Sequence, residues 1–268
     1  MVRDRRFETV LGDPVARASE TLVSARRPWQ AALAAAAVAI GLFVLPVPAE
    51  AADTSIFMVG NSLSRGVKGR LRKLLGYDGI RAHVYSVTTA GTTLEDHLES
   101  RRVAKRFAKR DRWDWVVLQE QSAGIWDERL ESSEGWAARA ETAGAVPLLM
   151  MTWADRGMPT SIDDWLLGDA YGDHGYLAAA TLYDTELAAA GLVFRELAAD
   201  PYMQSRLWSR DGHHAASLGR WAAALSLYRE IRGAPIDLAV LAEALPGYPS
   251  EEVFAAVETA RQRVADAR

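Results

Sequence analysis

The sequence predicts a three-layer α/β/α domain, in which helices cover both faces of a central, mainly parallel β-sheet. Short apolar runs that end at glycine or polar residues alternate with amphipathic segments along the chain. Strands that alternate with helices are joined by crossovers, which place the strands parallel. A length of 268 residues with 49% hydrophobic content supplies one sizeable core. No repeat or low-complexity linker divides residues 52–268, so we expect a single domain there.

The first expected strand is the apolar run Ile56–Val59, which breaks at Gly60. A helix should follow, because the apolar residues of 67–75 recur at helical spacing with Arg and Lys between them. Ser62 therefore stands at the carboxyl end of a buried strand and near the positive end of a helix. Open α/β sheets bind their ligands at such strand ends.

The rest of the chain continues this alternation. Further strands are expected at Arg81–Val87, Trp115–Leu118, Val146–Thr152 and Gly191–Phe194. One helix should begin after a cap at Thr92 or Thr93 and carry the basic residues between Arg101 and Arg110, a run that we interpret as a solvated outer face. Other helices are expected to include Trp136–Glu141, Tyr176–Ala190, Ala215–Ile231 and Ser250–Ala267. Residues 155–175 are rich in Gly, Asp and Pro without a clean period, which is typical of a lid or of a surface connection.

Residues 1–51 read as an amino-terminal leader. Arg26 and Arg27 precede an uncharged apolar run over 28–49, and Ala49-Glu50-Ala51 has the small-x-small form of a cleavage site. The pattern predicts export to the periplasm, the cell surface or the medium, with a mature amino terminus near Ala52. The alternative is an uncleaved anchor formed by residues 28–49, since about 20 apolar residues suffice to span a bilayer. The membrane would then be a partner only through this leader.

Composition excludes several classes of function. The chain has no cysteine, which excludes disulfides, thiolate metal sites and cysteine nucleophiles. Residues 52–268 carry 25 basic and 30 acidic side chains, a net charge of −5. A mildly acidic body argues against nucleic acid as a partner, because such binding needs a surface that neutralises phosphates.

Polar and glycine residues at several predicted strand and helix ends should meet in one crevice. They are Ser62 after the first strand, Gly91 after the second, Gln119 and Gln121 after the third, and Asp211 and His214 before the helix near Ala215. A serine becomes a nucleophile when a base takes its proton and a third group fixes the tautomer of that base. Ser62, His214 and Asp211 supply these three roles.

These residues resemble those of the SGNH (GDSL-like) hydrolases over about residues 56–231. In that superfamily the first block ends a strand with the nucleophile, as Gly60-Asn61-Ser62-Leu63 does here. The second block supplies an oxyanion-hole glycine, matched by Gly91, and the last is an Asp-x-x-His pair, matched by Asp211 and His214. The spacing selects His214 rather than His213. The resemblance implies the flavodoxin-like SGNH fold.

The match departs from the superfamily at two points. Asn61 stands where Asp is common, and Gln119-Glu120-Gln121-Ser122 replaces the usual Gly-x-Asn-Asp. This combination is similar to a poorly described bacterial branch with GNS and QEQS blocks. A glutamine amide can donate to an oxyanion as asparagine does. The sequence leaves open whether Gln119 or Gln121 does so beside the N–H groups of Ser62 and Gly91.

The implied activity is a serine hydrolase that cleaves a carboxylic ester, without a metal or other cofactor. His83, His97 and His174 lack ligand spacing and are interpreted as structural. Two alternatives remain open, an acyltransferase with the same triad and a catalytically silent binding protein. Trp126, Trp153, Trp165 and Trp208 follow strand ends or lie in loops, which suggests aromatic platforms for a carbohydrate ester. The expected substrate is therefore a small-molecule or carbohydrate ester.

Overall fold

The computed structural model describes residues 53–121, 132–157 and 175–268, which belong to one compact unit. The leader prediction for residues 1–51 lies outside the described residues, as does most of the expected loop at 155–175. Within the described ranges, no helix combines the length and the hydropathy needed to cross a membrane.

The centre of the fold is a parallel sheet with the strand order β2-β1-β3-β4-β5. Its strands are β1 (Asp53–Gly60), β2 (Arg81–Thr88), β3 (Trp115–Leu118), β4 (Val146–Met150) and β5 (Glu186–Ala188). The chain order reverses between β1 and β3, and ligands of open α/β sheets bind outside the carboxyl ends of strands at such a reversal. Ser62 follows β1 and Gln119 follows β3, so both lie beside this point.

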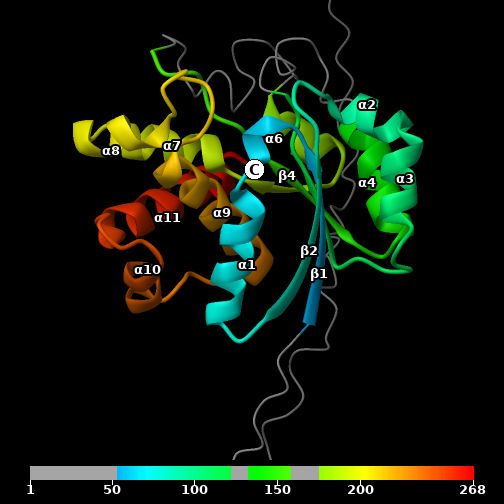
Figure 1. The fold of residues 1–268 in the computed structure, drawn as a ribbon, viewed down its shortest axis with the longest axis horizontal. Coiled ribbons are helices and arrows are strands. Elements are labelled where there is room, and N and C mark those ends of the chain that lie inside the picture. The colour runs from blue at the N-terminus through cyan, green and yellow to red at the C-terminus, as the bar shows by residue number, and fades with distance from the viewer. Residues whose placement is uncertain (1–52, 122–131, 158–174) are drawn as a thin grey trace, which may run out of the picture. The chain divides into compact units, whose positions relative to one another are not determined.

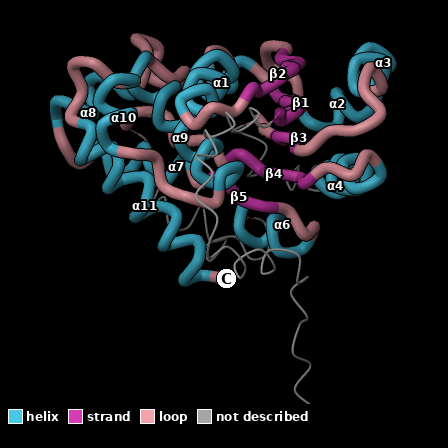
Figure 2. Tube along the Cα trace, turned by 90° about the horizontal axis from the view of Figure 1, so that it is seen from below, coloured by secondary structure: helices cyan, strands magenta, loops and turns pink. Residues whose placement is uncertain are grey.

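Helices cover both faces of the sheet, which confirms the predicted three-layer architecture (Figures 1 and 2). One face carries the short 3-10 helix η1 (Ser62–Ser64) with α1 (Val67–Tyr77), α7 (Ala190–Ala198), α8 (Pro201–Leu207), α9 (Ser217–Arg232), α10 (Leu238–Ala244) and α11 (Ser250–Ala267). The other carries α2 (Leu94–Glu99), α3 (Arg101–Phe107), α4 (Ser132–Thr142) and, beside β5, α6 (Tyr176–Leu182). α1 packs against α9, and α9 against α7.

The predicted fifth strand is wrong. Residues Gly191–Phe194 lie in α7, and the strand is the three-residue β5 between α6 and α7. Gly191 allows α7 to approach the end of β4 closely, because a Cβ at this position would lie 2.1 Å from the carbonyl oxygen of Thr152. Gly191 therefore allows close packing of α7 on the end of β4 and does not mark a turn before a strand.

The single helix predicted after Thr93 is two helices. Thr93 caps α2 through a capping box with Asp96, as expected for one of the two threonines. Ser100 then adopts an extended conformation, and its hydroxyl accepts a hydrogen bond from the Val103 N–H at the start of α3. Most of the basic side chains between Arg101 and Arg110 are exposed, which agrees with a solvated face. The short helices α8 and α10 were not predicted.

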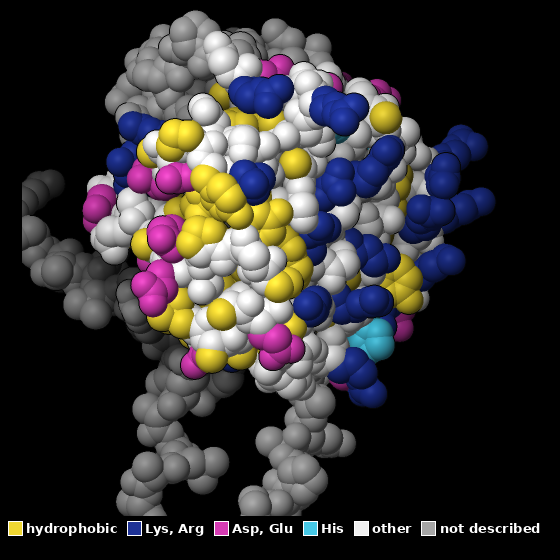
Figure 3. Space-filling view, turned by 60° about the vertical axis from the view of Figure 1, so that its left-hand side comes forward, with side chains coloured by type: hydrophobic (Ala, Val, Ile, Leu, Met, Phe, Trp, Pro, Cys, Tyr) yellow, Lys and Arg dark blue, Asp and Glu magenta, His cyan; other side chains and the backbone are white. Residues whose placement is uncertain are grey.

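The surface of the unit is uneven in charge. Figure 3 shows Lys and Arg side chains crowded on one part of the molecule, and hydrophobic side chains with acidic neighbours on another. α1 contains four basic residues and no acidic one. A net charge of −5 over residues 52–268 thus conceals a basic region.

Candidate active site

Ser62 lies in a tight turn that the sequence around it makes possible. β1 is buried from Ser55 to Gly60 and delivers the chain into η1, which begins at Ser62. A Cβ at Gly60 would lie 2.5 Å from Oε1 of Gln119, so only glycine allows β1 and the end of β3 to approach this closely. The Asn61 side chain caps η1 by accepting a hydrogen bond from the Leu63 N–H at 3.0 Å.

Asp211 and His214 lie in a loop that closes on itself before α9. Trp208 and Ala215 form an antiparallel bridge, and the Ser209 N–H donates to the His214 carbonyl at 2.7 Å. Gly212 adopts a φ of 74°, which glycine allows without strain. Oδ1 of Asp211 accepts the backbone N–H of His214 at 3.0 Å, so the carboxylate folds back onto its own turn.

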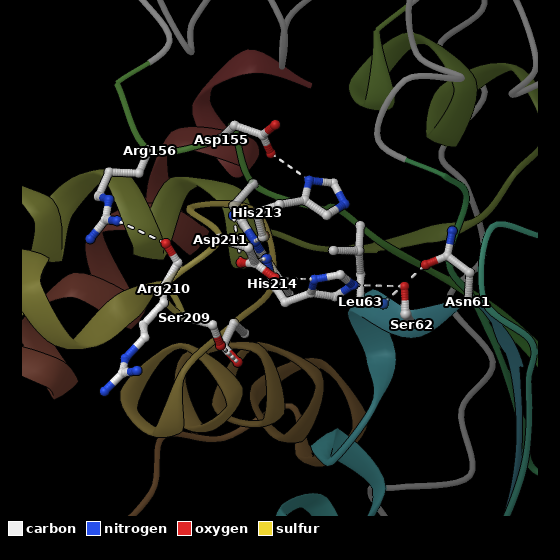
Figure 4. Close-up of polar contacts among 12 residues, drawn as sticks. Asn61, Ser62, Leu63, Asp155, Arg156, Ser209, Arg210, Asp211, His213 and His214 are labelled. Atoms are coloured by element: carbon white, nitrogen blue, oxygen red, sulfur yellow. Dashed lines mark hydrogen bonds and ion pairs between the residues drawn. The ribbon is translucent and has the colours of Figure 1, made fainter.

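The structure brings the three predicted residues into one hydrogen-bonded chain (Figure 4). Nε2 of His214 lies 2.9 Å from Oγ of Ser62, and Nδ1 of His214 lies 2.7 Å from Oδ2 of Asp211. The hydrogen bond from His214, with two backbone N–H groups, lowers the pKa of Asp211 to about 2. The carboxylate is thus ionised at neutral pH and accepts the proton on Nδ1, which leaves Nε2 as the acceptor for the serine hydroxyl.

Gln119 is engaged with Asn61. Its Oε1 accepts the Asn61 N–H at 2.9 Å, and its Nε2 donates to Oδ1 of Asn61 at 3.0 Å and to the carbonyl of Glu120. Both donors of the amide are therefore used, in a side chain that is 1% exposed. Gln119 holds the turn that carries Ser62 and has no N–H left for a substrate.

Gln121 and Gly91 occupy more open positions. Gln121 is partly exposed, and its side chain has no hydrogen bond to the described residues. Gly91 is exposed with a φ of 70°, in a turn that contacts the Ser62 turn through the hydrogen bond from Nδ2 of Asn61 to the Thr92 carbonyl. Among the described residues, the backbone N–H groups of Ser62 and Gly91 have no acceptor.

Two supports of the site were not predicted. Glu120 is fully buried, and its carboxylate accepts the N–H of Leu94 at the positive end of α2. His97, interpreted from sequence only as structural, is buried and bonded through Nε2 to the Gly60 carbonyl at 2.7 Å. Burial lowers the pKa of His97, so the ring is neutral and donates this hydrogen bond. The only sequence signal for the role of Glu120 was the presence of an acidic residue between two glutamines.

The suggested aromatic platforms need correction. Trp153 is 2% exposed and stacks on Phe194 with ring centroids 4.3 Å apart, so its faces are not open to a sugar. Trp208 meets Phe194 edge to face, and its indole N–H donates to the Ala154 carbonyl. Trp126 and Trp165 lie outside the described residues.

Comparisons with solved structures identify the fold. A candidate SGNH hydrolase from Slackia heliotrinireducens is 27% identical, with a TM-score of 0.54, and the match covers 67% of this chain and 99% of that chain. A DUF4886 family protein from Bacteroides uniformis is 17% identical, with a TM-score of 0.60 over 80% of this chain and 95% of the other. An acetyl xylan esterase, AlAXEase, is 15% identical, with a TM-score of 0.52 over 66% and 99%.

No family model matches the sequence, and no curated protein matches it. The assignment therefore depends on the three-layer fold, its strand order and the likeness to the Slackia protein. Together they place this chain in the SGNH-like hydrolase superfamily, as an SGNH-type serine hydrolase.

Proposed function

We propose that this protein is an exported serine esterase that transfers an acyl group from an ester to water. Ser62 attacks the ester carbonyl, His214 takes the serine proton and returns it to the leaving alcohol, and Asp211 orients His214. Water, activated by His214, then releases the acyl group and regenerates Ser62. The observation that carries this proposal is the continuous hydrogen-bonded chain from Ser62 through His214 to Asp211.

The oxyanion formed during attack needs positioned donors. We assign the backbone N–H groups of Ser62 and Gly91 to this role, because neither has an acceptor among the described residues. Of the two glutamines, Gln121 is the better third donor, since both donors of Gln119 are bonded to Asn61 and Glu120. Gln119 is then a positioning residue.

The substrate in this proposal is a small acyl ester that reaches the site from solvent. The side chains of His214 and Asp211 are 38% and 50% exposed, so the described part of the site is open. The leader in residues 1–51 supports export, which would place the substrate in the cell envelope or outside the cell.

Labelling with a fluorophosphonate tests the nucleophile. We expect one adduct, located on Ser62 by mass spectrometry, together with hydrolysis of p-nitrophenyl acetate. Ser62→Ala should abolish both. Ser64→Ala is the matched control in the same turn, and it should keep the adduct because the Ser64 hydroxyl donates to the Asn61 carbonyl instead of contacting His214.

Other outcomes would point to the alternatives. A folded protein with neither an adduct nor hydrolysis would be a binding protein that keeps the fold. An adduct on Ser62 with acyl transfer to an added sugar exceeding hydrolysis would make the protein an acyltransferase. An adduct on a different serine would overturn the triad.

A further inference from the structure

A second carboxylate–imidazole pair lies directly beside the first. Nδ1 of His213 is 2.6 Å from Oδ1 of Asp155, and the rings of His213 and His214 meet edge to face with centroids 4.8 Å apart (Figure 4). The side chains of His213 and Asp155 are 37% and 46% exposed. The proposed reaction uses neither of them.

The backbone around His213 is held from two directions. Its N–H donates to Oδ1 of Asp211, and its carbonyl accepts the indole N–H of Trp153 at 3.0 Å. The next segment after β4 contributes another contact, in which the Arg156 N–H donates to the Gly212 carbonyl at 2.8 Å. The ring of His213 is therefore fixed at its backbone, at Nδ1 and against His214, rather than free to rotate.

The bond to Asp155 determines what the ring presents to the crevice. A carboxylate accepts the proton on Nδ1, so Nε2 of the neutral ring carries a lone pair. Among the described residues, Nε2 of His213 has no hydrogen-bond partner. In Figure 4 this edge of the ring faces away from Asp155, on the side where Leu63 and Ser62 lie. A positioned acceptor without a partner next to the nucleophile is suited to a hydrogen-bond donor on the substrate.

The neighbouring charges favour a neutral donor over an anion. The carboxylates of Asp155 and Asp211 flank the two imidazoles. The guanidinium groups of Arg156 and Arg210 lie across the loop from His213, and Arg156 donates to the Arg210 carbonyl (Figure 4). The two carboxylates repel an anionic substrate, whereas a hydroxyl can donate directly to Nε2.

We propose that His213, oriented by Asp155, accepts a hydrogen bond from a hydroxyl of the ester's alcohol portion. The enzyme then prefers esters of polyhydroxylated alcohols, such as sugars or glycerol, over esters of simple alcohols. This inference depends on the proposed esterase function. It gives the carbohydrate preference suggested by the sequence a polar origin, in place of the faces of Trp153 and Trp208, which are buried or packed.

The test compares two acetate esters whose alcohols differ only in hydroxyl groups, glycerol monoacetate and propyl acetate. For the natural enzyme, kcat/KM should be higher for glycerol monoacetate. His213→Phe keeps an aromatic ring but has no acceptor, and it should lower the ratio of the two kcat/KM values by about 10-fold, as for one hydrogen bond. The rate with propyl acetate and the fluorophosphonate labelling of Ser62 should change little.

Two further variants keep the result interpretable. His213→Gln restores an amide oxygen as acceptor and should recover part of the preference. His83→Phe is the matched control, because His83 lies in β2 opposite Ser55 in β1, at the other end of the sheet, and it should leave the ratio unchanged.

An unchanged ratio in His213→Phe would overturn the inference. An equal fall for both esters, with slower labelling of Ser62, would show that His213 only supports the loop and would also overturn it. If the natural protein hydrolyses neither ester and gives no adduct, the proposed function itself fails, a result distinct from an active enzyme without preference.

Discussion

Asn61 illustrates how one side chain can connect three segments of the site. Its Oδ1 accepts from the Leu63 N–H and from Nε2 of Gln119, and its Nδ2 donates to the Thr92 carbonyl. A carboxylate here could accept the first two bonds but could not donate the third. Asn61 and Gln119 are both departures from the superfamily pattern, and the structure shows that they bond to each other.

This arrangement predicts that the two glutamines fail in different ways when truncated. Gln121→Ala should lower kcat by about 100- to 1000-fold with little change in KM, as for an oxyanion donor that acts in the transition state. Gln119→Ala leaves the buried N–H of Asn61 without its acceptor and should lower the free energy of unfolding by about 1–3 kcal/mol. Kinetics and urea denaturation of both variants measure the two effects.

The two variants serve as controls for each other. Gln121→Ala should unfold at the same urea concentration as the natural protein, because the Gln121 side chain has no hydrogen bond to the described residues. If kcat of Gln121→Ala stayed unchanged in an active enzyme, the oxyanion hole would consist of backbone N–H groups alone.

At the scale of single residues, the sequence predicted which residues lie in the site better than it predicted their hydrogen-bond partners. Glycine, a serine at a strand end and an Asp-x-x-His pair carry enough pattern to predict that Ser62, Asp211 and His214 lie together, and the structure brings them into contact. Asp155 and His213 are 58 positions apart, and neither falls at a recognisable spacing. Their contact depends on how the segment after β4 meets the loop before α9, which no local pattern encodes.

At the scale of the elements, a hydrogen bond joins α2 to the carboxyl end of β1. The imidazole of His97 in α2 donates to the Gly60 carbonyl, one residue before Asn61. Burial lowers the pKa of His97 from 6.5, and the hydrogen bond to Gly60 opposes this shift in part. The folded protein therefore binds a proton at His97 less readily than the unfolded chain does.

This shift predicts a pH dependence of stability. Because the folded-state pKa is lowered, the contribution of His97 is fully present above about pH 6.5 and is lost as the pH falls toward and through the folded-state value. The melting temperature should accordingly fall from pH 7 to pH 5. His97→Gln retains an N–H donor that does not titrate, and its melting temperature should fall less over the same interval.

His83, which is partly exposed, provides a control for the pH dependence assigned to His97. His83→Gln should retain the full dependence of the natural protein, because His83 lies at the far end of β2 from Gly60. Equal dependence in His97→Gln and the natural protein would show that other groups account for it.

The elements that the sequence predicted well have a strong period and clear ends. β3 and α11 occur at the predicted bounds, and α1 begins at the predicted residue. Two of the errors fall where short elements follow each other without a glycine or proline to separate them. β5 has three residues between α6 and α7, so its pattern merges with the flanking helices. Ser100 looks like a helix residue until its cap geometry is known.

For the molecule as a whole, the first strand, β1, begins at Asp53, next to the predicted mature amino terminus at Ala52. We predict that a protein that starts at Ala52 folds and is labelled at Ser62 as efficiently as the full chain. In the native host, sequencing of the mature amino terminus should give a start near Ala52. Recovery of intact residues 28–51 in the membrane fraction would instead establish an anchor.

The separation of Ser62 and His214 has a consequence for the order of folding. They are 152 positions apart, and the loop that carries His214 is positioned by the segment after β4 and by α9, which packs on α1. Closing so long a loop costs entropy before any contact compensates for it. As the ribosome delivers the chain, the proposed nucleophile Ser62 is synthesised long before its proposed base His214. We therefore expect the serine of a nascent or truncated protein to be unreactive. Recovery of esterase activity during refolding would then report that the last third of the chain has docked.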